Sequence, residues 1–434
     1  MKEQGDPYLV QNNSLRRVPP NFHIQISLTM IKYFGTWPPK DKFRLLYLVY
    51  SALIFIFMLG VYLSVQFINL IIIWGDVQCM VASAFLLMTN SVHAYKILVI
   101  LRNQKRIQKI LSMLESEKFS KDTDKFERIF TWYAWQGIYH HMRYQSLGTM
   151  AVFCWGFTPI LAAISGEVRR LPMEAWYPYN TKDTPAFQIT CAHQSFAITL
   201  GCFHNISMDT LITGLLNVAC CQLEVVKHNI LELDVAERLR NIEEAMLKQK
   251  LHNSIQHSID VMGFIVEVKN IFGHVVLVQL LVNCIIICLT AFHITQMTVF
   301  IPVETFGMIT HMCCMTYQIF IYCWHGNELS LQSQSLSQTA FSSNWWKFDK
   351  KMNNDLRIVI TRFCKPITFM AGPLLELSLQ TFELLGDIAN TREGTSRLHF
   401  VILCHNIKNY NNIDLYIHNF SIEICTIKLY RQKV

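Results

Sequence analysis

Seven runs of about twenty mostly apolar residues are the feature that most limits how this chain can fold. A helix needs about that many apolar residues to cross a bilayer, where only helices and closed barrels satisfy their backbone hydrogen bonds. The composition agrees, because 52% of the residues are hydrophobic and 16% are charged, whereas soluble domains carry about a quarter charged residues. We therefore predict an all-α membrane protein with seven transmembrane helices, over residues 45–73, 77–101, 146–165, 187–221, 271–294, 305–324 and 364–385.

The distribution of Lys and Arg predicts the orientation of these spans, because basic residues next to a span stay in the cytoplasm. The segment before the first span and the stretches 102–128, 227–269 and 347–365 together hold 27 Lys and Arg, whereas the alternate loops hold three. Residues 1–44 are therefore predicted to be a cytoplasmic N-terminal segment. The protein is expected in the plasma membrane, which it crosses several times.

The longest of the short extracellular loops, Leu171–Phe187, is rich in Trp, Tyr and Pro. Aromatic rings with a polar end settle at the membrane interface, and proline restricts the backbone. The loop is expected to form a folded cap over the outer ends of the helices. Simple interfacial anchoring is the alternative.

Cytoplasmic helices are expected to extend two of the spans. In residues 223–270 the apolar side chains recur at steps of three and four, which indicates a helix that continues span four and returns into span five. A second amphipathic stretch, residues 329–363, contains Trp345, Trp346 and Phe348. Helices with apolar faces outside a membrane need partners, so we predict a cytoplasmic helical anchor that forms a subunit interface. Packing within one chain would explain the same pattern.

Enzyme chemistry is not indicated by the sequence. It contains no phosphate-binding glycine loop, nucleophile elbow or metalloprotease helix. His311 lies near Cys313 and Cys314, but their positions on an apolar helix favour packing over metal binding. The net charge of +7 comes from the cytoplasmic loops, so it indicates topology and contact with membrane lipids instead of nucleic acid. We expect no catalytic residues, no metal and no cofactor.

The stretch Gln318–Phe382 resembles the C-terminal region of the insect odorant receptors. The matching pieces are, in order, Tyr322 to Trp324, Gly326 to Leu329, Ser343 to Trp345, Lys365 and Pro366, Ala371 and Gly372, Leu377 to Leu379, and Thr381 and Phe382. The loop beginning at Leu171 and the stretch His252–Phe272 are similar to other parts of the same family.

This resemblance implies seven spans with the N-terminus inside the cell. Members of the family are odour-gated, non-selective cation channels, in which an odour-tuning subunit forms a heterotetramer with a shared coreceptor in the dendrite of olfactory neurons. The coreceptor has an extra-long cytoplasmic loop between spans four and five, whereas this chain has a short one. The chain therefore resembles a tuning subunit.

The family's ligands are small volatile organic molecules, bound among the outer halves of spans two to six. An apolar cavity with few polar groups suits such ligands. By depth along the spans, the expected ligand-binding residues are Phe85, Met88, Phe153, Trp155, Phe157, His193, Phe196, Cys288, Phe292 and Met308. Ordinary helix packing is the alternative role for each of them.

The likeness is expected to stop after Phe382. The tail, residues 386–434, contains Asp387 and Arg392, which a lipid-facing helix would not tolerate. Two other seven-helix classes stay open as alternatives: a gustatory-type receptor of the same superfamily, and a G-protein-coupled receptor with its N-terminus outside. A third alternative is a membrane protein that binds ligands without conducting.

Overall fold

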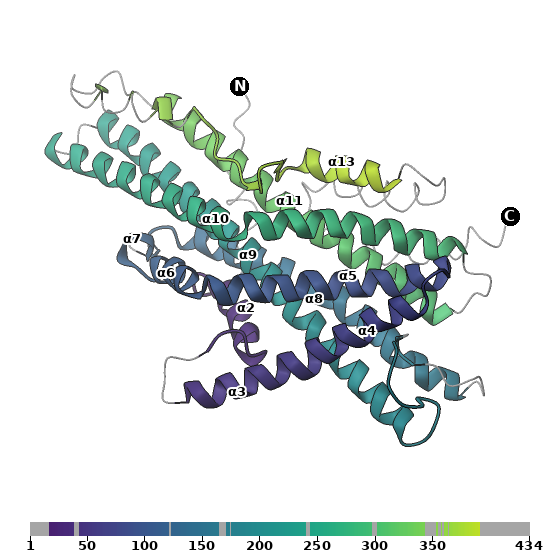
Figure 1. Cartoon of the computed structure of the whole chain (residues 1–434). Helices are drawn as coiled ribbons and strands as arrows, with labels where there is room; N and C mark the ends of the chain where they lie inside the picture. Colours follow the sequence, from purple (N-terminus) through teal and green to yellow (C-terminus); the bar gives the residue numbers. More distant parts are fainter. Residues whose placement is uncertain are drawn as a thin grey trace. The chain divides into compact units, whose positions relative to one another are not determined.

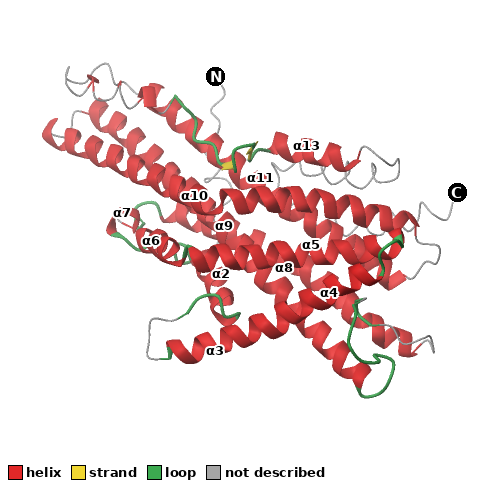
Figure 2. Ribbon diagram, in the orientation of Figure 1, coloured by secondary structure: helices red, strands yellow, loops and turns green. Residues whose placement is uncertain are grey.

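The computed structural model describes residues 17–38, 43–120, 123–164, 171–239, 244–296, 302–342 and 353–390, except for positions 174, 355–356, 358–359 and 363. Helices make up most of this part of the chain (Figure 1, Figure 2). In chain order they are α2 (Phe22–Tyr33), α3 (Arg44–Ile54), the π-helical turn η1 (Phe55–Gly60), α4 (Val61–Ile72), α5 (Val77–Arg102), α6 (Gln104–Leu114), α7 (Glu117–Ser120), α8 (Glu127–Ile164), α9 (Ala186–Leu239), α10 (Glu244–Gln296), α11 (Pro302–Ser342) and α13 (Leu379–Asn390).

Five helical stretches among the described residues are long and apolar enough to cross a membrane. They are Arg44–Ile72, Cys79–Arg102, Glu127–Ile164, Ala186–Glu232 and Lys248–Thr295. These stretches correspond to the first five predicted spans, and the sixth predicted span lies within the 41 residues of α11. The fold is therefore the predicted all-α fold.

The seventh predicted span, 364–385, differs from the structure. Its first part contains a two-stranded antiparallel hairpin of β1 (Met370–Ala371) and β2 (Leu375–Glu376), and α13 begins only at Leu379. Gly372 has a φ of +60°, and its N–H donates to the carbonyl of Gly273 in α10 at 2.9 Å. Glycine favours this left-handed conformation, Pro366 precedes the hairpin and Pro373 lies in its turn, so the apolar run does not continue as a helix.

The chain divides into two compact units, Met1–Phe382 and Glu383–Val434. Within the first unit, helix α9 lies among most of the other helices. It contacts α2, α5, α8, α10 and α11. Every residue from His204 to Val226 is buried. A helix that is buried on all sides belongs to the core of a large bundle. This core begins near the middle of the predicted fourth span and continues past its cytoplasmic end.

The N-terminal segment contains a helix, α2, that packs against α8 and α9. Ser27 and Thr210 share a hydrogen bond of 2.9 Å between their hydroxyl oxygens. At Gly137 of α8, an added Cβ atom would come within 2.6 Å of the ring of His23. The missing side chain of Gly137 therefore allows α2 to approach the bundle closely.

The cytoplasmic extensions of spans four and five are helical, as the periodicity predicts. Helix α9 continues to Leu239, and α10 begins at Glu244. Figure 1 shows α10 running beside α5, a packing that is extensive in the structure. The ion pair between Arg106 and Glu267, with a distance of 2.6 Å, joins α6 to this extension.

Candidate ligand-binding site

Three aromatic side chains lie at the same depth on three neighbouring spans. Phe85 comes eight residues after the start of α5, Trp155 comes nine residues before the end of α8, and His311 comes nine residues after the start of α11. At 1.5 Å per residue, each lies about 12–14 Å from the outer end of its helix. This level is the outer half of the predicted bundle.

The three rings form one buried cluster, which we call the outer aromatic cluster (Phe85, Trp155 and His311). The ring centroids are 6.4 Å apart for Phe85 and Trp155, 5.5 Å for Phe85 and His311, and 5.2 Å for Trp155 and His311. Such distances are typical of attractive aromatic packing. All three side chains are buried, as is Met308, one turn before His311.

The close approach of α8 and α11 at this cluster depends on Gly307. A Cβ atom there would lie 3.1 Å from the Cβ of Cys154 and 3.4 Å from the indole nitrogen of Trp155. The helices can meet this closely because residue 307 has no side chain. Phe85, Trp155 and Met308, which were predicted from the sequence, are thus brought together, and His311 and Gly307 were missed.

Three other predicted ligand-binding residues face away from the packed interior of the chain. Phe153 and Phe157 stack on each other with centroids 4.3 Å apart, and they are 55% and 38% exposed. Phe196 of α9 is 54% exposed. None of the three is part of the outer aromatic cluster.

The remaining predicted residues are partly buried on α5, α9 and α10. Met88 lies on α5, and Cys288 and Phe292 lie on α10. His193 lies near the outer end of α9, where its ring faces Phe57 edge-on at 5.4 Å and its Nε2 is 3.3 Å from the carbonyl oxygen of Phe57. A ligand-binding role for these residues stays a prediction.

The extracellular loop Leu171–Phe187 packs onto α4 and α9. The backbone N–H of Met173 donates to the side chain of Gln194 at 3.1 Å, and that of Trp176 donates to the carbonyl of Val65 at 3.4 Å. The hydroxyls of Tyr179 and Thr190 are 2.8 Å apart. These contacts give the loop the folded arrangement that its prolines and aromatic residues indicate.

A buried polar network centred on Asp209 of α9 lies deeper in the bundle. The carboxylate accepts hydrogen bonds from the ammonium of Lys96 on α5 and the amide of Gln318 on α11. It also accepts bonds from the hydroxyls of Tyr144 at 3.1 Å and Tyr322 at 2.8 Å. Lys96, Tyr144 and Tyr322 are 19 or 20 residues from the outer ends of their helices, so the network lies about 15 Å below the outer aromatic cluster.

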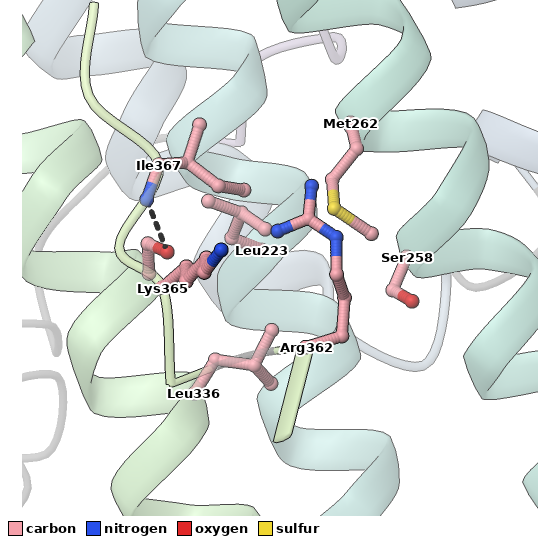
Figure 3. Close-up of a pocket in the computed structure, with 8 residues that line it drawn as sticks. Leu223, Ser258, Met262, Leu336, Arg362, Lys365 and Ile367 are labelled. Carbon is pink, nitrogen blue, oxygen red and sulfur yellow. Dashed lines mark hydrogen bonds between the residues drawn. The ribbon is translucent and has the colours of Figure 1, made fainter. Parts of the chain in front are cut away.

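A small pocket lies in the cytoplasmic part of the bundle, far from the outer aromatic cluster. It is lined by α9, α10, α11 and the segment before β1, and its volume is about 10 Å³, the size of one water molecule. Figure 3 shows Arg362, Lys365 and Ile367 at this pocket. The N–H of Ile367 donates to the hydroxyl of Ser333 at 2.9 Å. The hydrogen bond joins the segment that leads to α13 to the inner end of α11.

Two carboxyl groups, the buried Glu224 and the partly buried Glu328, lie just beyond the cytoplasmic ends of spans four and six. Burial and the nearby charge of Glu224 raise the pKa of Glu328 to about 7. Burial also acts to raise the pKa of Glu224, but its hydrogen bond to His228 and the charge of Lys227 outweigh this and lower it overall. Glu328 is therefore the carboxyl group that holds a proton close to neutral pH.

The predicted interface residues Trp345, Trp346 and Phe348 lie outside the described residues. Within the described ranges, no group of three or more His, Cys, Asp or Glu side chains could hold a metal ion. The interface role of Trp345, Trp346 and Phe348 stays a prediction.

The family model described as 7tm Odorant receptor matches residues 76–389 of this chain. Odorant receptor Or1 of Anopheles gambiae is 26% identical over 386 residues, which cover 82% of this chain and 90% of that receptor. Odorant receptor 46a, isoform A, of Drosophila melanogaster is 24% identical and covers 62% of this chain and 69% of its own. The family match runs past Phe382, where the sequence resemblance was expected to stop.

Solved structures show the same fold. The insect olfactory receptor OR5 of Machilis hrabei, in complex with eugenol, superimposes with a TM-score of 0.74 and 15% identity over 92% of this chain and all of that receptor. A second structure of OR5 superimposes with a TM-score of 0.70. Because the family model spans well over half of the sequence and the helices are arranged as in OR5, this chain belongs to the insect odorant receptors, a family of receptors and not of enzymes.

Proposed function

We propose that this chain is the ligand-tuning subunit of an odour-gated, non-selective cation channel in the plasma membrane. The observation that carries the proposal is the outer aromatic cluster, in which Phe85, Trp155 and His311 from three spans meet at one depth. Aromatic walls with few polar groups suit small volatile ligands. OR5 shares the fold and is described in complex with eugenol, a small aromatic molecule.

The connection between α9 and α10 favours a tuning subunit over a coreceptor. Helix α9 ends at Leu239 and α10 begins at Glu244, so only four residues join them. This short connection has no room for the extra-long loop that the resemblance implies for a coreceptor. The family match also favours an odorant receptor over the gustatory and G-protein-coupled alternatives.

Assembly with a coreceptor into a heterotetramer is supported by apolar side chains outside the predicted spans. Ile259 and Val266 of α10 are 50% and 54% exposed, and Leu331 and Phe341 of α11 are 49% and 66% exposed. Large apolar side chains exposed to the cytoplasm mark a protein interface. We infer that these cytoplasmic helices, together with Trp345, Trp346 and Phe348, hold the subunits together.

Gating follows from a difference in affinity between two arrangements of the channel. A ligand opens the channel to the extent that it binds the open arrangement more tightly than the closed one. The polar network around Asp209 joins α5, α8, α9 and α11 directly below the outer aromatic cluster. A shift of these helices at the outer aromatic cluster therefore also acts on the deeper part of the same helices, which the hydrogen bonds to Asp209 hold together.

Whole-cell recording with the coreceptor tests this function. Cells that express both chains should give an odour-evoked cation current with at least one member of a panel of volatile esters, alcohols, aldehydes and terpenoids. Cells with the coreceptor alone are the control. Silence despite verified surface expression contradicts the proposal if it persists after the residues beyond Phe382 are replaced by a typical family ending.

A further inference from the structure

The imidazole of His311 is buried in the outer aromatic cluster without a hydrogen-bond partner. Its side chain is 5% exposed, and its Nδ1 atom is shielded from solvent and makes no hydrogen bond within the described residues. Its ring neighbours, Phe85 and Trp155, present aromatic surfaces on which it can pack. A buried polar group in this condition is costly and is uncommon in folded proteins.

Three other buried histidines of the bundle each have a bonded ring nitrogen. His204 bonds to the hydroxyl of Thr36 at 2.6 Å, His141 bonds to Thr210 at 2.9 Å, and His140 bonds to Tyr317 at 2.9 Å. All three lie deeper than His311 along their helices. His311 differs from these three because it has no hydrogen bond within the described residues, and it lies at the level proposed for ligand binding.

The other members of the cluster are mainly apolar. Phe85 and Trp155 present aromatic faces, and Gly307 has no side chain beside the indole of Trp155. The cluster therefore combines aromatic faces, which bind an apolar body, with one polar atom, the Nδ1 of His311, that has no hydrogen bond within the described residues.

We propose that His311 selects the ligands of this receptor, and that these ligands are small volatile molecules with an apolar or aromatic body and one hydroxyl group. The proposal rests on the proposed function at the same site. A hydroxyl group both donates and accepts, so it satisfies Nδ1 in either tautomer of the imidazole. A site with an unpaired polar atom rejects analogues that cannot form the missing bond. When an analogue without the hydroxyl group binds, the Nδ1 atom of His311 stays buried without a hydrogen bond.

Matched pairs of odorants test this proposal in cells that express the full chain with the coreceptor. The pairs are benzyl alcohol with toluene, and 2-phenylethanol with ethylbenzene. Within each pair the hydroxyl compound should reach half-maximal current at a concentration about 3- to 10-fold lower than the compound without the hydroxyl group, as expected for one neutral hydrogen bond. Equal sensitivity to both members of each pair would overturn the inference.

Variants of His311 separate hydrogen bonding from shape. His311→Phe keeps an aromatic ring and should bring the two members of a pair to within about 2-fold of each other, while the response to the hydrocarbon persists. His311→Gln can still form a hydrogen bond and should keep the preference. Phe85→Leu alters only the apolar wall, so it should shift both members of a pair alike. An unchanged preference in His311→Phe would overturn the inference.

The same recordings separate this inference from the proposed function. Currents that do not discriminate between the members of a pair contradict the role of His311 and leave the channel function standing. No current from any compound of these pairs or of the wider panel, with both chains at the cell surface and with a typical family ending, contradicts the channel function and this inference together.

Discussion

Replacing Lys96 by Met should destabilise the protein by about 3–5 kcal/mol, because the charge of Asp209 would remain buried without its cation. The two side chains are 1% and 0% exposed, so water cannot take the place of the ammonium group. Tyr144 and Tyr322 would continue to donate hydrogen bonds to the carboxylate. These bonds reduce the loss, which places the expected value towards the lower end of the range.

Thermal unfolding of the purified chain in lipid nanodiscs measures this loss. A chain of 434 residues has an unfolding entropy of roughly 0.9 kcal/mol per kelvin, so the midpoint should fall by about 3–5 °C. The matched control is Lys118→Met, which removes one cation from the more exposed pair of Lys118 and Asp260. Exposed pairs contribute about 0–1 kcal/mol. A midpoint for Lys96→Met that equals the control would refute the buried ion pair.

A second change, Asp209→Asn, tests whether the cause is charge. In the double variant of Lys96→Met and Asp209→Asn neither member of the buried ion pair carries a charge, and the Asn side chain can still accept hydrogen bonds from the neighbouring hydroxyls. The double variant should therefore be more stable than Lys96→Met alone. If it is less stable, the loss comes from packing around Lys96 and not from the unpaired carboxylate.

Two further predictions concern the cytoplasmic half of the chain. Gly326→Ala should lower the free energy of unfolding by about 1–3 kcal/mol, because its Cβ would come within 2.6 Å of the carbonyl oxygen of Leu377. The control is Gly263→Ala, whose Cβ would meet no atom within 4 Å, and it should leave the unfolding midpoint equal or higher. The pKa of Glu328 is about 7 in the folded protein, above the ordinary glutamate pKa of 4.5. The contribution of Glu328 to stability therefore declines as the pH rises from about 4.5 to 7. Glu328→Gln should therefore raise the midpoint at pH 8 and change it little at pH 4, and a gain of equal size at both values would contradict the raised pKa.

The spans and the cytoplasmic helices could be predicted because each depends on a pattern of apolar residues that are close together in the sequence. An apolar run of about twenty residues has few other uses, and a period of three to four residues indicates a helix. The predicted start of the seventh span was wrong for a local reason as well, since the prolines and Gly372 within the apolar run favour a turn. Contacts between residues that are distant in the sequence could not be predicted. Lys96 and Asp209, for example, are 113 positions apart, and no pattern in a single sequence pairs them.

Helix geometry separates the three ligand-binding residues that the sequence predicts on α8. Successive residues of an α-helix are turned by about 100°, so Phe153 and Phe157 share one face, while Trp155 lies about 200° from each of them. One cavity cannot be lined by all three, and the structure buries Trp155 while Phe153 and Phe157 are exposed. Depth along a span is therefore insufficient without the direction of the side chain.

The same geometry holds the signal by which His311 could have been found. Residues three apart lie on one helix face, so a prediction that places Met308 in the ligand site also places His311 beside it, one turn deeper. In the sequence His311 lies near two cysteines, a pattern that suggests a metal site more readily than a place on this helix face. The sequence does not show which histidine lacks a partner, because His204 and His311 are both histidines in apolar helices. Only the packing shows that Thr36 bonds to the first, while the Nδ1 of the second has no hydrogen bond within the described residues.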